Sequence, residues 1–109
     1  MPMSHDEVLR IVREFRQQLA ALYGDRLRGV YLYGSYARGE AEEGSDIDVA
    51  VVLAGPVHRR EESRRTSRLI SDLSLRENCE LMPFFLSQEE YHEAPYAIFR
   101  SIVREGVPA

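Results

Sequence analysis

The sequence predicts an α/β fold of the α+β kind, in which helices flank a small mixed β-sheet in the order αβαβαβα. Three observations predict it. Amphipathic helical stripes lie at both ends of the chain and in its middle. Short apolar runs at 27–33, 47–53 and 79–86 separate these stripes and are rich in β-branched and aromatic residues. The length of 109 residues suits one core, so we expect a single domain over residues 1–109.

The first helix is predicted by a capping box, Ser-x-x-Glu, from Ser4 to Glu7. Gly24 is placed to end this helix. Between them, apolar side chains recur at helical spacing and are expected to pack in the core: Val8, Ile11, Val12, Phe15, Leu19 and Leu22. The first strand follows at 27–33.

The turn after this strand has the features of an anion site. Gly34-Ser35 is followed by a short run that can form a helix, Tyr36-Ala37-Arg38. A strand that turns into a helix in this way presents free backbone N–H groups and a hydroxyl to an anion. Glycine lets a phosphate approach the backbone closely, and Arg38 can add a forked, charged contact.

Two carboxylates open the second strand, at 47–53. Because side chains alternate along a strand, Asp46 and Asp48 are expected to project from the same face. Such a pair repels itself unless a cation lies between the two groups, and ligands that are all oxygen suit Mg²⁺, whose shell phosphate oxygens complete. A phosphate site beside metal-binding carboxylates predicts nucleotidyl transfer. The alternative is a pair of solvent-facing aspartates after a glycine turn.

Gly55-Pro56 ends the second strand, and a helix is predicted over 58–76 with a narrow apolar stripe. Its arginines, at positions 59, 60, 64, 65, 68 and 76, allow two interpretations. They form a solvated face on which Glu61 and Glu62 pair locally with Arg65, or they form a docking surface for an acidic partner or a triphosphate.

The third strand is predicted at 79–86, and Pro83 places it at the edge of the sheet or at a bulge. Glu80 is a single carboxylate in this apolar run and can serve as a charge that protects the edge from aggregation. A second capping box, Ser87 to Glu90, then starts a short helix. Pro95 is expected to begin the last helix, which ends at Gly106 and carries a stripe of Tyr96, Phe99, Ile102 and Val103.

Composition excludes several classes of protein. The net charge of −4 argues against broad nucleic-acid binding, and the lack of lysine excludes P-loop and Schiff-base chemistry. The three histidines show no metal-ligand spacing with Cys79, so a zinc site is not expected. No apolar run is long enough to span a membrane, and the N-terminus lacks the pattern of a signal peptide. The single cysteine fits a reduced cytoplasm.

Gly34-Ser35, ten residues, then Asp46-Ile47-Asp48 resembles the motif of the polymerase-β-like nucleotidyltransferase superfamily, and the flanking Arg38-Gly39 and Ser45 resemble its minimal nucleotidyltransferase branch. The resemblance implies the nucleotidyltransferase fold, with ATP bound at Gly34, Ser35, Arg38 and Ser45 and with two Mg²⁺ ions held by Asp46 and Asp48. It also implies a third acidic ligand on a neighbouring strand, for which Glu80 is the candidate.

The resemblance further implies a biological role. Small members of this branch pair with a HEPN-domain toxin, a ribonuclease, and silence it by adenylylating a tyrosine. The chain is therefore expected to act as the antitoxin. Two alternatives stay open: an aminoglycoside-type nucleotidyltransferase acting on a small molecule, and a non-catalytic binding antitoxin of the same fold.

Overall fold

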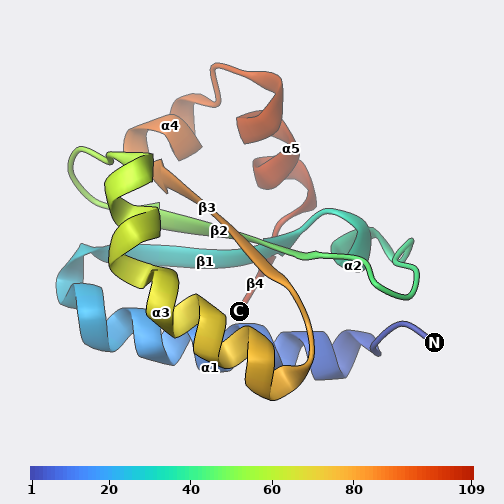
Figure 1. The fold of residues 1–109 in the computed structure, drawn as a ribbon. Coiled ribbons are helices and arrows are strands. Elements are labelled where there is room, and N and C mark those ends of the chain that lie inside the picture. Colours follow the sequence, from blue (N-terminus) through green and yellow to red (C-terminus); the bar gives the residue numbers. More distant parts are fainter.

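Figure 1 shows the computed structural model, which describes residues 1–109. Its elements follow one another as α1 (His5–Tyr23), a 3-10 turn (Gly24–Arg26), β1 (Leu27–Tyr33), α2 (Ser35–Arg38), β2 (Ile47–Leu53), α3 (Arg59–Glu77), β3 (Leu81–Ser87), α4 (Gln88–Glu93), α5 (Ala97–Glu105) and β4 (Val107–Pro108). None of the helices is long and apolar enough to cross a membrane.

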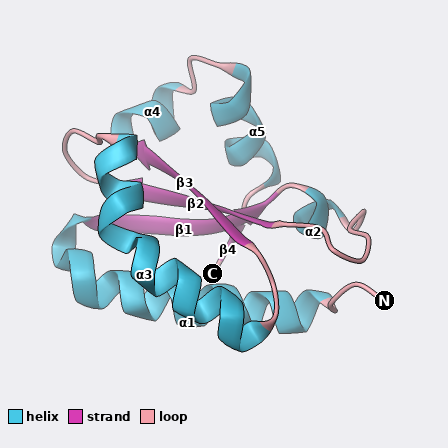
Figure 2. Cartoon of the chain, viewed as in Figure 1, coloured by secondary structure: helices cyan, strands magenta, loops and turns pink.

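The four strands form one mixed sheet in the order β3-β2-β1-β4. Strand β1 is antiparallel to β2 and β4, whereas β2 and β3 run parallel, as the α3 crossover requires. Helices α1 and α3 cover one face of the sheet, and α4 and α5 cover part of the other (Figure 2). The predicted mixed sheet flanked by helices is confirmed, and the short strand β4 is an addition that the sequence did not predict.

The predicted stripe of α1 is correct except at its last position. Leu22 is 45% exposed, and Tyr23 takes its place in the core. The Tyr23 hydroxyl donates a hydrogen bond of 2.8 Å to Glu62 on α3. The predicted pair of Glu62 with Arg65 exists, at 3.6 Å, but Glu62 is buried rather than solvated. Burial of this carboxylate is tolerated because the Tyr23 hydroxyl and the Arg26 guanidinium bind it as well.

Strands β1 and β2 begin and end where the sequence predicted, but β3 starts two residues later than expected, at Leu81. Asn78 ends α3 in the left-handed conformation, so Cys79 and Glu80 form the connection to the strand. The position of β3 at the sheet edge is confirmed, and Pro83 lies within it.

The C-terminal helices differ from the prediction in one respect. The capping box at Ser87 and Glu90 is present, with both of its hydrogen bonds. Helix α5, however, begins at Ala97 rather than Pro95, because Tyr96 has an extended backbone and acts as the N-cap. Tyr96 and Val103 are 70% and 44% exposed, so only Phe99 and Ile102 of the predicted stripe are buried.

An ion pair between Arg59 and Glu90 connects the start of α3 to α4. Arg59 donates to both carboxylate oxygens of Glu90, at 3.0 and 2.9 Å, and to the Phe85 carbonyl at 2.9 Å. The Arg59 contact lowers the pKa of Glu90 from 4.5 to about 2. Because the folded pKa is the lower one, the pair stabilises the fold above about pH 4.5 and loses this effect as the pH falls toward 2.

The variant Glu90→Gln is therefore expected to lower the free energy of unfolding at neutral pH by about 1 kcal/mol. Glutamine can still accept the hydrogen bond from the Ser87 N–H, so the cap is retained. Urea unfolding at a series of pH values measures the difference, which should vanish near pH 2. Glu89→Gln, at an exposed neighbouring position, is the control. Equal stability of both variants at every pH would contradict this role for Glu90.

Candidate active site

The turn between β1 and α2 requires glycine for two reasons. Gly34 has a φ of 78°, a left-handed conformation that side chains disfavour. A Cβ atom at this position would also meet Oδ2 of Asp48 well inside van der Waals distance. The register explains the contact, because Asp48 on β2 lies opposite Tyr33 on β1. The missing side chain at Gly34 therefore lets the Asp48 carboxylate lie against the turn.

Asp46 and Asp48 flank Ile47, whose side chain is fully buried beneath the sheet. Alternation then directs both carboxylates to the opposite face, as the sequence predicted. Asp46 is exposed and Asp48 is half-buried. Burial raises the pKa of Asp48, the charge of Asp46 raises it further, and the Arg38 guanidinium lowers it. Since the ionised pair is unfavourable by itself, the two carboxylates are suited to a divalent cation.

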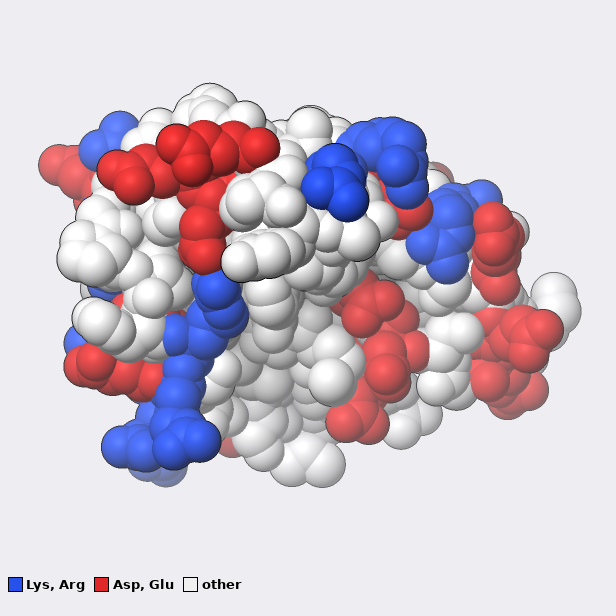
Figure 3. All heavy atoms as spheres, turned by 90° about the horizontal axis from the view of Figure 1, so that it is seen from above, with Lys and Arg blue, Asp and Glu red and all other residues white.

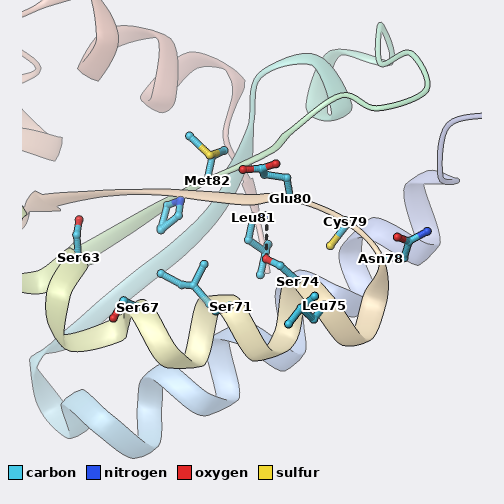
Figure 4. A pocket seen from close by; sticks show the side chains of 12 residues that line it. Ser63, Ser67, Ser71, Ser74, Leu75, Asn78, Cys79, Glu80, Leu81 and Met82 are labelled. Atoms are coloured by element: carbon cyan, nitrogen blue, oxygen red, sulfur yellow. Dashed lines mark hydrogen bonds between the residues drawn. The ribbon is translucent and has the colours of Figure 1, made fainter.

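The backbone of Glu80 lies next to the strand that carries this pair, but the three carboxylates do not form a preformed metal site. Its carbonyl accepts a hydrogen bond of 2.8 Å from the Ile47 N–H, so the backbones of the two segments are adjacent. Figure 4 shows the exposed Glu80 side chain on the same side of its segment as Met82, away from α3. No group of three or more His, Cys, Asp and Glu side chains is arranged to hold a metal ion. Glu80 as third ligand thus stays a prediction.

Glu80→Gln tests that prediction because it removes the charge and keeps the size. If Glu80 is a ligand, nucleotidyl transfer should fall at least about tenfold, and a higher Mg²⁺ concentration should restore part of it. Steady-state rates over a Mg²⁺ titration measure both effects. Glu93→Gln, an exposed position outside the site, is the matched control. An unchanged rate with lower solubility would identify Glu80 as a charge that protects the sheet edge.

Glu105 is part of the site, although the sequence did not predict it. Its carboxylate accepts hydrogen bonds from the Gly34 N–H at 3.3 Å and from the Arg38 guanidinium at 3.0 Å. These are two of the donors that were predicted for phosphate. Glu105 is 71 residues from Gly34 in sequence, so no local pattern connects them. The only signal was the resemblance of Arg104-Glu105-Gly106 to the end of minimal nucleotidyltransferase domains.

Tyr33 lies between these acidic groups at the end of β1. Its pKa is raised to about 12 by burial and by the charges of Asp48 and Glu105, so its hydroxyl stays protonated. The Ser35 hydroxyl forms no hydrogen bond within the protein and remains available to a ligand. The hydroxyls of Ser35 and Tyr33 can therefore donate to an anion without breaking an existing hydrogen bond. The Gly34 N–H and the Arg38 guanidinium must first release the Glu105 carboxylate before they can bind an anion.

Ser45 closes the acidic loop that precedes the aspartates. Its N–H donates to the Glu42 carbonyl at 3.0 Å, and its hydroxyl accepts from the Glu42 N–H at 2.8 Å. Ser45 and Glu80 line one cavity of about 470 Å³, together with Tyr36 and the first residues of the chain. The structure therefore places Ser45 near Glu80, although neither Asp46 nor Asp48 lines this cavity, and a contact between Ser45 and nucleotide stays a prediction.

Comparison with known proteins identifies the family to which the chain belongs. The model of the family "Nucleotidyltransferase domain" matches residues 12–104, which include the turn, both aspartates and Glu80. The chain belongs to the nucleotidyltransferase domain family. It is 32% identical over 77 residues, 71% of its own length, to a protein of Methanocaldococcus jannaschii named "Putative protein adenylyltransferase", of which the match covers 77%. Three further proteins with this name, from the same organism, are 40% to 42% identical over segments that cover 40% to 50% of their length.

Solved structures agree with this nucleotidyltransferase in fold. One described as a "putative minimal nucleotidyltransferase" is 27% identical, with a TM-score of 0.61 over 98% of this chain and 97% of that one. A toxin–antitoxin structure with AMP-PNP is 19% identical, with a TM-score of 0.60 over 97% of this chain and 72% of that one, and shares the fold alone. The predicted nucleotidyltransferase fold and enzyme class are confirmed.

Proposed function

We propose that this nucleotidyltransferase is a Mg²⁺-dependent protein adenylyltransferase, which transfers AMP from ATP to a hydroxyl group of a partner protein. The observation that carries the proposal is the contact between the turn and the metal-binding carboxylates: Asp48 lies against Gly34, next to the unoccupied Ser35 hydroxyl. A triphosphate at the turn would then place its α-phosphate within reach of the carboxylates. The name of the Methanocaldococcus relative and the AMP-PNP in a structure of the same fold support this substrate class.

In the proposed reaction, an acceptor oxygen bonds to the α-phosphorus of ATP, and the bond from that phosphorus to the bridging oxygen of the β-phosphate breaks. Pyrophosphate leaves, and the proton of the acceptor passes to a carboxylate, for which Glu80 is the candidate. Ser35 and the backbone N–H groups of α2 bind the phosphates. Positioning and charge neutralisation supply most of the acceleration in such reactions.

Asp46 and Asp48 would hold Mg²⁺, with Glu80 as the proposed third ligand. Two carboxylates are enough for this ion, because it usually completes its shell with phosphate oxygens and water. When bound, Mg²⁺ would neutralise charge on the phosphates and favour departure of pyrophosphate. The raised pKa of Asp48 fits this role, since a carboxylate pair that is costly when empty gains most from a cation.

The partner that we propose is a HEPN-domain ribonuclease toxin, with a tyrosine as acceptor, so that the chain acts as the antitoxin. A toxin–antitoxin assembly among the structures of the same fold supports it. The alternative, a small cationic substrate, needs an acidic pocket. The acidic loop could contribute Glu40, Glu42 and Glu43 to such a pocket, but Glu40 forms an ion pair with Arg38 and Glu43 forms one with the N-terminal amine.

Co-expression with the genomic neighbour tests the proposal. The two proteins should co-purify, and intact-mass measurement should show the neighbour heavier by one or more AMP units. In cells carrying Asp46→Asn/Asp48→Asn the added mass should disappear and the neighbour should become toxic. Ser35→Ala is the milder comparison, because it removes one hydroxyl contact and should leave measurable transfer. If the neighbour stays unmodified while an aminoglycoside is adenylylated, the small-molecule alternative is correct.

A further inference from the structure

A groove of about 640 Å³ runs between α3 and the edge strand β3 (Figure 4). One wall consists of the short side chains of Ser63, Ser67, Ser71 and Ser74, which share one side of α3. The other wall is the first part of β3, from Leu81 to Pro83, in which the Met82 side chain is 45% exposed. Glu80, the proposed third carboxylate, lines the end of the groove nearest the active site.

The edge of β3 is not free to add another strand. Its outward N–H at Leu81 donates to the Ser74 hydroxyl at 3.3 Å, and the next outward position, Pro83, has no N–H. The Phe85 carbonyl accepts from Arg59 at 2.9 Å. At each of these three outward-facing positions of β3, a backbone group is either already hydrogen-bonded or missing. A ligand in the groove would therefore be held by side chains rather than by backbone hydrogen bonds to β3.

A row of free arginines borders the groove. Arg60, Arg64 and Arg68 recur every four residues on the exposed side of α3, on the turns that carry the serines, and none of them forms an ion pair. They lie outside the groove itself, and Arg60 and Arg64 line a second hollow beside it with His58 and Glu61. The other arginines of this helix, Arg59, Arg65 and Arg76, all pair with glutamates of the chain. Figure 3 shows basic side chains gathered at the lower left, over the start of α3, with acidic side chains against their upper end and left side and a separate acidic group nearer the centre.

From this arrangement we infer that the groove docks an extended acidic segment of the acceptor protein. Its carboxylates face Arg60, Arg64 and Arg68, and its hydroxyl-bearing residue crosses the edge of β3 to reach Glu80, Asp46 and Asp48. The inference rests on the proposed function, because it assumes a protein acceptor. Both interpretations of the arginines on α3 then apply, each to a different set. The arginines in ion pairs stabilise the fold, and the three without ion pairs bind the acidic partner.

The geometry fixes the spacing of the expected segment. Along the axis of α3, Arg68 and Arg60 are roughly 15 and 27 Å from Asn78, next to Glu80. An extended chain spans roughly 3.3 Å per residue, so about five to eight residues should separate the acidic positions from the acceptor hydroxyl. Acidic residues directly beside the acceptor would instead meet the carboxylates of the active site and be repelled.

Fluorescence anisotropy with labelled peptides tests the inference without any transfer step. The spaced peptide carries three glutamates about six residues from its tyrosine, and it is made in two versions, with the glutamates either N-terminal or C-terminal to the tyrosine. A second peptide of the same composition has the glutamates directly beside the tyrosine. The spaced peptide, in at least one version, should bind about tenfold tighter, and salt should weaken it. Arg64→Glu/Arg68→Glu should lower its affinity at least about tenfold.

Arg13→Glu/Arg28→Glu is the matched control, because it makes the same change in charge at two exposed arginines outside the groove. Equal affinities for the two peptide designs, or equal losses in the two variants, would overturn the inference. Transfer to the partner protein, measured separately, distinguishes the two proposals. If Arg64→Glu/Arg68→Glu leaves that transfer unchanged, the docking site is wrong and the proposed function stands. If the spaced peptide binds as expected but no protein is adenylylated, the proposed function is wrong.

Discussion

Asp46→Asn/Asp48→Asn should lower AMP transfer by at least about three orders of magnitude. The two carboxylates share one face at the start of β2, and Asp48 lies against the Gly34 turn. Asparagine keeps the shape and the hydrogen-bonding capacity but removes the charge that would hold Mg²⁺. Single-turnover rates with ATP and Mg²⁺ measure the loss, and circular dichroism verifies the fold. Full transfer by the double variant would contradict the catalytic assignment.

The single variant Asp48→Asn separates function from stability. The pKa of Asp48 is raised in the folded protein, so ionising this group favours the unfolded state, and the cost is present above the folded pKa and absent below the unfolded value of 3.8. Without metal at neutral pH, Asp48→Asn should therefore raise the melting temperature, although it should lower AMP transfer. Addition of Mg²⁺ should stabilise the original protein and not the variant.

The sequence predicted the parts of the fold that repeat locally. Strands β1 and β2 were correct to the residue because a turn motif follows one and Gly55-Pro56 ends the other. The errors lie where tertiary contacts decide. Tyr23 replaces Leu22 in the core because its hydroxyl can reach Glu62, which no helical period reveals. Strand β4 has only two residues and exists through its pairing with β1, so it has no pattern of its own.

The candidate site shows the same division. The turn and the aspartates lie within twenty residues of one another, and their spacing predicted a phosphate site beside a pair of carboxylates. Glu105 reaches Gly34 and Arg38 only because β4 pairs with β1 and brings the end of α5 to the turn. Long-range packing of this kind has no signature in a single sequence.

Gly34→Ala should reduce transfer by at least about two orders of magnitude, even though it adds a single methyl group. The new Cβ would displace the Asp48 carboxylate from the turn and, with it, one side of the metal site. Gly44→Ala is the matched control, since Gly44 also has a positive φ, of 85°, but no atom lies within 4 Å of its Cβ position. Both variants should lose about 1 kcal/mol from backbone strain, and Gly34→Ala should lose more because its Cβ also clashes with Asp48.

Only Gly34→Ala should also lose ATP-dependent binding of Mg²⁺, and Gly34→Val should weaken ATP binding far more than Ser35→Ala does. Calorimetric titration of ATP, with and without Mg²⁺, measures these effects alongside the rates. Equal activity of Gly34→Ala and Gly44→Ala would mean that Asp48 can move without consequence, and the arrangement of turn and carboxylate would then not be the catalytic one. A larger loss of ATP binding in Ser35→Ala than in Gly34→Val would instead assign phosphate binding to the serine hydroxyl and not to the glycine turn.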